Sequence, residues 1–228
     1  MIKFYYHPSP NPAKVALFFE ESSLPYELVP VDTRKGEQHS PEFLAINPNA
    51  KTPAICDGDI RVFDSTAILY YLAEKTGLFL PDNQPGLRAK MHSWMQFVAT
   101  GVGPYTGQYV HFKLIAPDNA YARNRYDFEA WRHWRIIDTH LSTHHYMLGD
   151  TYSIVDMNLW GWARSVTFAL GEAALDELPN LKRFLDEING RPAALRVAEL
   201  KDRFAFKQEI DAETMKALFP QNERLQRA

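Results

Sequence analysis

The sequence of 228 residues contains only one cysteine, Cys56. A single cysteine excludes an internal disulfide, a CxxC redox pair and every metal motif built from several cysteines. Thiol chemistry in this protein therefore requires either Cys56 or a thiol that a ligand brings. Because proteins without disulfides are typical of reducing compartments, we expect this protein to be cytoplasmic.

Long apolar runs and an excess of positive charge are absent as well. The longest apolar runs, such as residues 15–19, are far shorter than the ~20 residues of a membrane span, and the first residues lack the apolar core of a signal peptide. Lysine and arginine number 25 against 28 aspartate and glutamate residues, which gives a net charge of −3. We therefore expect neither a membrane nor a nucleic acid as a partner.

What the sequence does contain is typical of a globular protein, with 46% hydrophobic and 23% charged residues. Residues 2–6 and 26–31 are short segments with the pattern of strands. Between them, Asn11 and Pro12 are suited to the N-cap and the first position of a helix. This order predicts a βαβ unit with parallel strands and a right-handed crossover.

A short helix at residues 40–43, a hairpin at residues 51–63 and a further helix complete the first part of the chain. The hairpin is predicted from two short strands on either side of an Asp-Gly turn. The further helix begins after Asp64 and ends at Gly77. The order β-α-β-α-β-β-α predicts one compact α/β domain at residues 1–80.

The remainder of the chain lacks strand patterns. Residues 81–86 are polar and rich in proline and glycine, which predicts a linker. Residues 87–228 show only helical periodicity, with a capping-box pattern at residues 153–156. We therefore expect the fold class α/β plus all-α, with an all-helical second domain. Its C-terminal tail, residues 201–228, would pack either over the cleft or along the helical domain.

Two local patterns in the first domain suit a peptide-like anionic ligand. Pro53 begins a strand, where it removes a donor from the ladder. A cis bond after Thr52 would turn the Thr52 backbone towards such a ligand, and an ordinary edge-strand proline is the alternative. Asp64 and Ser65 lie at a helix N-terminus, whose N–H groups and dipole favour a carboxylate. A capping pair without a ligand is the alternative there.

A third pattern is formed by Ser9 and Asn11, which lie where the first strand meets the first helix. A hydroxyl and an amide donor beside a helix N-terminus would lower the pKa of a bound thiol, as helix N-termini do for reactive cysteines. Taken separately, each residue is equally suited to a turn or a cap. All three patterns occur in one domain, at positions that the fold would bring together.

In four segments the sequence resembles the cytosolic glutathione transferase family. They are the Ser9–Asn11 turn and residues 51–55, 64–68 and 153–156. The resemblance extends from residue 1 to about residue 200. Within the family, residues 8–11 and 103–108 are most similar to the bacterial nu class, which includes the glutathione-dependent disulfide-bond oxidoreductases of the YfcG type.

The resemblance implies a thioredoxin-like N-terminal domain that binds glutathione and a helical-bundle domain that shapes the pocket for a second substrate. It also implies a homodimer. Glutathione, reduced or oxidised, would be the co-substrate and would supply the reacting thiolate, with no metal involved. Ser9 and Asn11 would be the catalytic residues that stabilise this thiolate.

Further residue roles are implied by the same resemblance. The glutathione-binding residues would be Gln38, Lys51, Thr52, Pro53, Asp64, Ser65 and Arg132. Arg132 would reach the ligand of the partner subunit. The second-substrate pocket would contain Tyr105, Gln108, Tyr109 and His111.

Two positions differ from the residues that are usual in the nu class. Ser9 replaces threonine, which keeps the hydroxyl but loses the β-branch that restricts its rotamer. Asp64 replaces glutamate and is one methylene shorter, which reduces its reach towards the amine of the ligand.

Three other features leave alternatives open. Tyr6 lies near the position of the catalytic tyrosine of other classes and is the alternative to Ser9 as thiol activator. Cys56 lies on a predicted strand, where a small buried hydrophobe is favoured over a nucleophile. His140 and His144 have the i, i+4 spacing of metal ligands, but no HExxH motif or carboxylate set completes the pattern, which favours a solvated helix end.

The sequence thus predicts a glutathione-dependent enzyme that reduces disulfides or transfers thiols. Conjugation of glutathione to an electrophile, or cleavage of an ether, is the alternative within enzymes, because it uses the same thiolate. A non-catalytic glutathione-binding protein is the alternative of another class. Ser9 and Asn11 argue against it, because a binding protein needs no thiol-activating donors. The second substrate is left open.

Overall fold

The computed structural model describes residues 1–226 and divides into two compact units. The first, here the α/β unit, consists of residues 1–71 and, among the described residues, 195–226, and the second, the helical unit, consists of residues 72–194. These units group residues by contact, whereas the sequence predicts a division along the chain at residues 81–86. That division stays a prediction.

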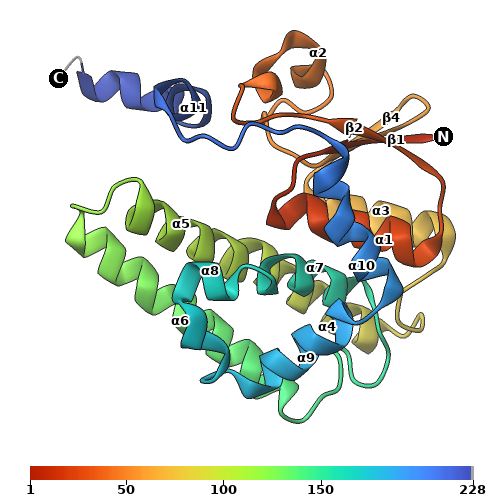
Figure 1. Cartoon of the computed structure of the whole chain (residues 1–228). Coiled ribbons are helices and arrows are strands. Elements are labelled where there is room, and N and C mark those ends of the chain that lie inside the picture. Colours follow the sequence, from red (N-terminus) through yellow and green to blue (C-terminus); the bar gives the residue numbers. More distant parts are fainter. Residues whose placement is uncertain (227–228) are drawn as a thin grey trace. The chain divides into compact units, whose positions relative to one another are not determined.

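The α/β unit is built on a four-stranded sheet with the strand order β2-β1-β3-β4 (Figure 1). β1 (Ile2–Tyr6) pairs in parallel with β2 (Tyr26–Pro30) and antiparallel with β3 (Ala54–Asp57). β3 forms an antiparallel hairpin with β4 (Ile60–Phe63). The predicted βαβ unit and the predicted hairpin are therefore confirmed.

Five helices belong wholly or partly to this unit, and 3-10 turns connect them. The helices are α1 (Pro10–Ser22), α2 (Pro41–Leu44), α3 (Ser65–Thr76), α10 (Pro192–Glu199) and α11 (Ala212–Leu218). The 3-10 turns are Glu37–His39, Leu200–Arg203 and Pro220–Gln226. α3 belongs to the unit up to Tyr71, and α10 belongs to it from Leu195.

Side chains of β1 alternate between the two faces of the sheet, as strand geometry requires. Phe4 is fully buried and packs against Phe19 of α1, with the ring centroids 5.3 Å apart. Tyr5 points to the opposite face and packs against Phe43 of α2 at 5.7 Å. Helices therefore cover both faces of the sheet, and β1 connects the two cores.

α1 is buried more completely than its pattern indicates. Val15, Phe18 and Phe19 have the i, i+3, i+4 spacing of an apolar stripe, but every residue from Pro12 to Phe19 is buried. The remaining positions are mostly small or aliphatic, and a helix that is apolar all round is typical of a core position. Lys14 is the one charged residue in this stretch.

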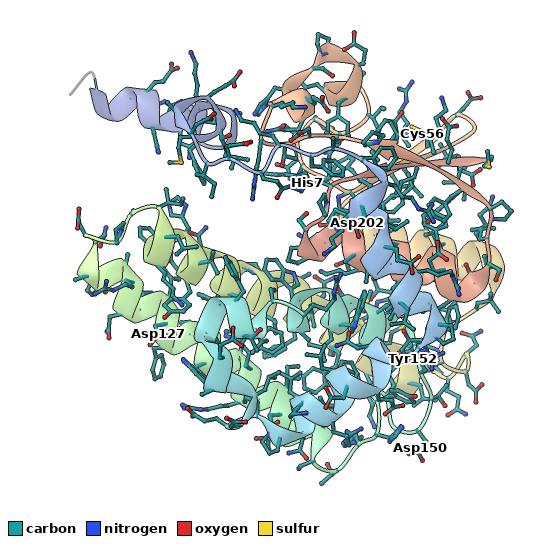
Figure 2. All side chains as sticks on the ribbon, viewed as in Figure 1. His7, Cys56, Asp127, Asp150, Tyr152 and Asp202 are labelled. Carbon is teal, nitrogen blue, oxygen red and sulfur yellow. The ribbon has the colours of Figure 1, made fainter. Side chains whose placement is uncertain are left out.

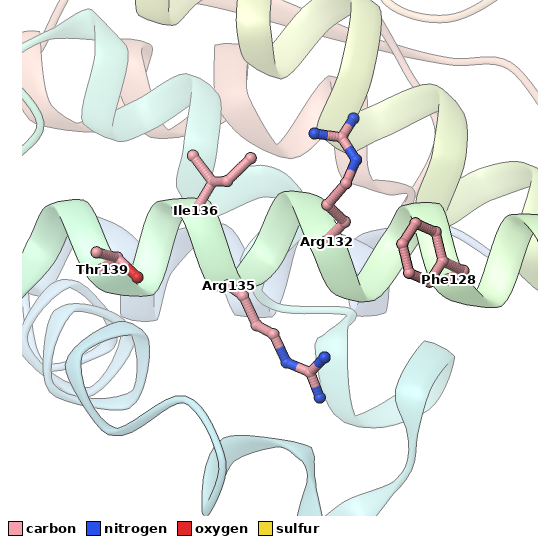
Figure 3. A pocket seen from close by; sticks show the side chains of 5 residues that line it. All are labelled: Phe128, Arg132, Arg135, Ile136 and Thr139. Atoms are coloured by element: carbon pink, nitrogen blue, oxygen red, sulfur yellow. The ribbon is translucent and has the colours of Figure 1, made fainter.

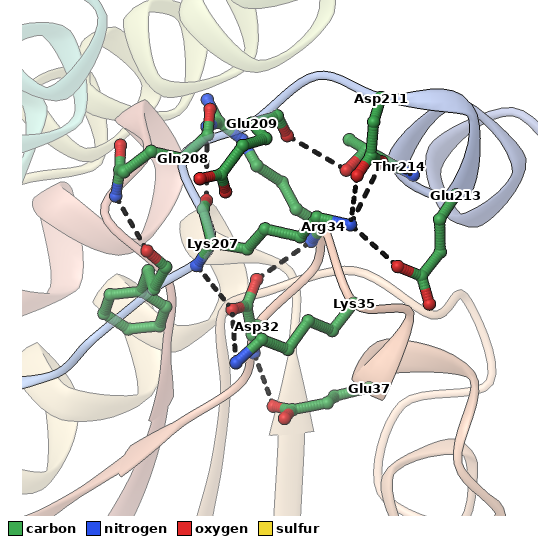
Figure 4. Close-up of polar contacts among 11 residues, drawn as sticks. Asp32, Arg34, Lys35, Glu37, Lys207, Gln208, Glu209, Asp211, Glu213 and Thr214 are labelled. Atoms are coloured by element: carbon green, nitrogen blue, oxygen red, sulfur yellow. Dashed lines mark hydrogen bonds and ion pairs between the residues drawn. The ribbon is translucent and has the colours of Figure 1, made fainter.

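The C-terminal tail, whose position the sequence left open, packs on the α/β unit. The backbone N–H of Lys207 donates to the Asp32 carboxylate at 2.7 Å, and Arg34 donates to the carbonyls of Lys207 and Gln208 (Figure 4). Phe206 adds an apolar contact, because its ring lies 5.2 Å from the ring of His7. The tail is thus held by both polar and apolar contacts.

The helical unit contains six complete helices, a π-helical turn and a 3-10 turn within residues 85–189. The helices are α4 (Pro85–Phe97), α5 (Gly103–Leu114), α6 (Ala120–Leu141), α7 (Ile154–Ala163), the short α8 (Val166–Leu170) and α9 (Pro179–Asn189). The turns are Val98–Val102 and Glu172–Leu175. The fold class predicted from the sequence, α/β plus all-α, is confirmed.

α7 is the most buried helix of this unit and begins with the predicted capping box. The Ser153 hydroxyl accepts from the N–H of Val155 at 3.2 Å, and the Asp156 carboxylate accepts from the N–H of Ser153 at 2.8 Å. Burial raises the pKa of Asp156 to about 6. The box therefore satisfies the first N–H groups of a helix that water does not reach.

The close approach of Gly101 to His133 generates a prediction for stability. A Cβ at position 101 would lie 2.5 Å from the buried His133 ring, and Phe97 and Tyr105 pack around that ring. Gly101→Ala should therefore lower the free energy of unfolding in urea by about 1–3 kcal/mol.

Gly86→Ala is the matched control, because among the described residues no atom beyond its chain neighbours and its own helix backbone lies within 4 Å of a Cβ at that helical position. It should leave the free energy of unfolding unchanged or raise it by up to about 1 kcal/mol. Equal stability of the two variants would contradict the packing described for Gly101.

Candidate functional site

Ser9 lies where β1 runs into α1 and is the N-cap of that helix. Its backbone is extended, with φ −140°, and its carbonyl accepts from the N–H of Ala13 at 3.2 Å. The hydroxyl makes no capping bond, and its contact in the structure is a long one of 3.5 Å to the carbonyl of His7. The hydroxyl is therefore not committed to the helix.

Asn11 is not the N-cap that the sequence predicts. α1 begins at Pro10, two residues before the predicted start at Pro12, so that Asn11 is the second helical residue. Pro10 suits the first position because its fixed φ is helical and its missing N–H has no partner there. The prediction for Asn11 as a cap is wrong, and its side chain is left for other contacts.

Ser65 connects the two helix N-termini that the sequence predicts as parts of the site. Its side chain is buried at the start of α3, with 5% of the residue exposed, and its hydroxyl donates to Oδ1 of Asn11 at 3.4 Å. The same hydroxyl accepts from Nζ of Lys14 at 3.4 Å. The N-termini of α1 and α3 therefore meet through one hydroxyl group.

Lys14 is a residue of this site that the sequence analysis missed. It is 1% exposed, and burial lowers the pKa of its amine to about 7 against the opposing effect of the Asp64 carboxylate. Its position three residues after Asn11, alone in an apolar stretch, is the signal that marks it. A lysine in such a stretch requires a polar partner, and Ser65 is that partner.

Asp64 caps α3, as predicted. Its Oδ1 accepts from the N–H groups of Thr66 and Ala67 at 2.8 and 3.2 Å. Its backbone has a left-handed φ of 71°, a region that aspartate and asparagine tolerate better than most residues. The carboxylate is exposed and lies beside the buried Ser65.

The segment from Lys51 to Pro53 leads into β3. Lys51 is exposed, and its carbonyl accepts from the side-chain amide of the buried Asn47 at 2.6 Å. The bond between Thr52 and Pro53 is cis, which is the first of the two alternatives left open by the sequence. Pairing with β1 begins at Ala54, so the backbone of Thr52 lies outside that ladder.

Gln38 lies under the tail. It is 4% exposed, and its amide nitrogen lies 3.3 Å from the carbonyl of Ala217 and 3.2 Å from the His39 ring. Its Oε1 is buried and has no hydrogen-bond partner among residues 1–226. Gln38 thus contacts the tail and His39, and not Ser9, Asn11 or Ser65.

Tyr6 is the last residue of β1, and His7 follows it shortly before Ser9. Tyr6 is 3% exposed, with its ring 5.7 Å from that of Phe4. Burial lowers the pKa of His7 to about 4, although the Asp32 carboxylate opposes this shift. His7 is therefore neutral at physiological pH, and the Tyr6 ring belongs to the core.

Cys56 lies away from His7 (Figure 2). In β3 it pairs with Lys3, near the start of β1, whereas Ser9 follows the end of that strand. The three residue steps from Lys3 to Tyr6 alone span about 10 Å. The only protein thiol is therefore remote from the N-terminus of α1.

Arg132 belongs to the helical unit and lines a surface groove of about 450 Å³ on α6. The other lining residues are Phe128, Arg135, Ile136 and Thr139 (Figure 3). The guanidinium forms an ion pair with Glu129 at 2.9 Å. Its predicted role towards a partner subunit stays a prediction.

The four residues predicted for the second-substrate pocket lie on α5. Tyr105, Gln108 and Tyr109 have i, i+3, i+4 spacing and share one helical face. The Tyr105 ring stacks on His133 at 4.8 Å. Burial raises the pKa of Tyr109 and lowers the pKa of His111. Their contact with a substrate stays a prediction.

The histidines near the end of α6 have structural contacts. The rings of His140 and His144 stack at 4.1 Å, and Nε2 of His140 lies 3.0 Å from the carbonyl of Met147. Within the part of the chain that the structure describes, no three histidine, cysteine, aspartate or glutamate residues are grouped to hold a metal ion. No helix of residues 1–226 has the length and apolarity needed to cross a membrane.

Family models match two parts of this chain. The glutathione S-transferase N-terminal domain matches residues 1–74. The glutathione S-transferase C-terminal domain matches residues 130–192. Both match regions that the structure folds as predicted.

Characterised relatives extend these matches over most of the chain. Disulfide-bond oxidoreductase YfcG of Escherichia coli K12 is 40% identical over 213 residues, which cover 89% of this chain and 98% of YfcG. Disulfide-bond oxidoreductase YghU of the same strain is 34% identical over 212 residues, which cover 86% of this chain and 73% of YghU.

Solved structures show the same similarity. A glutathione transferase family member of Pseudomonas fluorescens with two glutathione molecules bound is 34% identical, with a TM-score of 0.81 over 87% of this chain and 92% of the other. A Pseudomonas putida glutathione transferase with one glutathione disulfide bound per subunit is 32% identical, with a TM-score of 0.81 over 87% and 91%.

The capping role of Asp64 generates a prediction. Asp64→Ala removes both hydrogen bonds to the start of α3 and places alanine at a left-handed φ. It should lower the free energy of unfolding in urea by about 1–2 kcal/mol. Asp64→Asn keeps the acceptor and the backbone preference, so its stability should remain within a few tenths of a kcal/mol of the wild type. An equal loss in both variants would show that the charge, and not the cap, stabilises the helix.

Proposed function

The chain belongs to the glutathione S-transferase family, and we propose that it is an enzyme that reduces disulfides with the thiolate of bound glutathione. The relatives YfcG and YghU, both named disulfide-bond oxidoreductases, support this reaction. The glutathione and glutathione disulfide in the solved relatives support the co-substrate. The observation that carries the proposal is the contact of Asn11 with Ser65, 3.4 Å apart at two helix N-termini. Within the family, we assign the chain to the nu class.

In this proposal, the γ-glutamyl end of glutathione binds at the N-terminus of α3. The Ser65 N–H and hydroxyl bind its α-carboxylate, because Asp64 already occupies the N–H groups of the next two residues. The exposed Asp64 carboxylate faces the ligand ammonium group. The γ-glutamyl end is thus held by charges of both signs.

The rest of glutathione follows the segment before β3. The backbone of Thr52 pairs with the cysteinyl residue, since Thr52 and Pro53 precede the first pair of the β1–β3 ladder. Lys51 and Gln38 lie near the ligand carboxylates, with Lys51 as the exposed cation. This arrangement directs the ligand thiol from the sheet towards the start of α1.

Ser9 and Asn11 are the proposed catalytic residues. The N-terminus of α1 carries partial positive charge, and a nearby thiol has a lowered pKa for the same reason as cysteines at helix N-termini. The Ser9 hydroxyl, which makes no capping bond, donates to the thiolate. A hydrogen bond to a charged group contributes about 1.5–3 kcal/mol.

The reaction proceeds by two thiol–disulfide exchanges. The glutathione thiolate attacks one sulfur of the disulfide, forms a mixed disulfide and releases the other half as a thiolate, which takes up a proton. A second glutathione thiolate attacks the glutathione sulfur of the mixed disulfide and releases the second substrate thiol. Two glutathione molecules are oxidised to one glutathione disulfide while one substrate disulfide is reduced.

The proposal also covers the assembly, the second substrate and the domain boundaries of the protein. The protein acts as a cytoplasmic homodimer in which Arg132 reaches the glutathione of the partner subunit. The disulfide substrate binds beside Tyr105, Gln108, Tyr109 and His111. The thioredoxin-like domain comprises residues 1–80, and a linker at residues 81–86 connects it to the helical domain.

A steady-state assay tests this function. Oxidation of glutathione by a hydroxyalkyl disulfide should be faster than conjugation of glutathione to a nitroaryl halide. Cys56→Ala should retain near-normal turnover, because Cys56 pairs with the far end of β1. Preference for the nitroaryl halide would favour conjugation, and binding of glutathione without either turnover would favour a binding protein.

The role of Ser9 is tested by measuring turnover and glutathione binding separately. Ser9→Ala removes one charged hydrogen bond and should lower kcat about ten- to a hundredfold, while the glutathione Kd changes little. Tyr6→Phe is the matched hydroxyl deletion and should keep kcat near the wild-type value, because the ring lies in the core. A loss of turnover in Tyr6→Phe but not in Ser9→Ala would assign thiol activation to Tyr6.

A further inference from the structure

Lys14 is a buried cation without a counter-ion. It is 1% exposed, and its hydrogen bond in the structure is the 3.4 Å contact with the neutral hydroxyl of Ser65. Within residues 1–226 it forms no ion pair. A buried charge is stable only when it is paired with an opposite charge, and in the protein alone the ammonium form of Lys14 has only the neutral Ser65 hydroxyl as its hydrogen-bond partner among residues 1–226.

The position of Lys14 indicates where such a partner binds. Lys14 lies directly behind Ser65, on the inner side of the residue to which the proposed function assigns the ligand carboxylate. We propose that Lys14 is a positioning residue for this carboxylate, and that it takes up a proton to become an ammonium ion when glutathione binds. This inference rests on the proposed function, because it takes the ligand carboxylate to lie at Ser65.

The Ser65 hydroxyl lies between Lys14 and the proposed position of the ligand carboxylate. In the protein alone, its hydroxyl accepts from Lys14 and donates to Asn11. A carboxylate at the N-terminus of α3 gives this hydroxyl a stronger acceptor, since hydrogen bonds to charged groups are the stronger ones. The ammonium ion of Lys14, behind the same oxygen, then lies next to a negative charge.

The groups that face Lys14 act in opposite directions. The N-termini of α1 and α3 carry partial positive charge and disfavour the ammonium ion. Asp64 favours it, and its carboxylate is the charge that raises the pKa of Lys14 among residues 1–226. Burial outweighs Asp64, so the pKa of Lys14 is about 7. Just above that pH most of the protein holds a neutral lysine, and a bound anion raises this pKa again.

The proton balance of binding measures this effect. Calorimetric titration in two buffers of different ionisation enthalpy gives the number of protons that the protein takes up on binding. S-methylglutathione is the ligand because its methylated sulfur cannot bind or release a proton. With a Lys14 pKa of about 7, the wild type should take up about 0.9 proton at pH 8 and about 0.1 at pH 6. The affinity should accordingly fall as the pH rises above 7.

Lys14→Met keeps a side chain of similar length and removes the charge. This variant should bind S-methylglutathione without proton uptake. Relative to the wild type, its affinity should fall more at pH 6 than at pH 8. Lys3→Met removes an exposed lysine of β1 and should keep the wild-type uptake. Its measurement on the same ligand controls for the loss of one positive charge.

Two outcomes would overturn the inference. Binding by the wild type without proton uptake at pH 8 would show that Lys14 does not become charged. An unchanged uptake in Lys14→Met would assign the proton to another group. Both leave the proposed function intact, whereas a failure of the wild type to bind either ligand at both pH values overturns both proposals.

Discussion

The hydroxyl of Ser65 joins two helix N-termini within the α/β unit. It donates to Asn11 and accepts from Lys14, so one oxygen fixes the start of α3 against the start of α1. Two helix dipoles with their positive ends at one place favour anions. The proposed roles of Ser65 towards a carboxylate and of Ser9 towards a thiolate both depend on this arrangement. The N-termini of α1 and α3 therefore form a site suited to a ligand with two negative groups.

Much of this arrangement was predictable because it depends on local rules. The alternating burial of β1, the Asp-Gly hairpin and the cap at Asp64 each follow from a few neighbouring residues. The error at Asn11 was local too. Two prolines compete for the first helical position there, and Pro10 takes it. The sequence alone does not show which proline begins the helix.

Long-range packing produced the features that the sequence did not predict. Lys14 resembles a solvent-facing lysine until the helix around it is seen to be buried on all sides. Gln38 makes its contacts with Ala217, which is 179 residues further along the chain. No periodicity connects such positions. The candidate residues at Ser9, Asn11 and Ser65 were predictable, whereas the buried cation behind them was not.

The central claim is that the reacting thiolate belongs to the ligand and is stabilised at the start of α1. The most direct test is the pKa of the glutathione thiol in the complex, measured by the ultraviolet absorbance of the thiolate in Cys56→Ala, which has no protein thiol. One charged hydrogen bond corresponds to about one to two pKa units. The account therefore predicts that the pKa of the bound thiol lies about one to two units below the value of about 8.5 for a cysteine thiol. A bound thiol with an unchanged or raised pKa would contradict it.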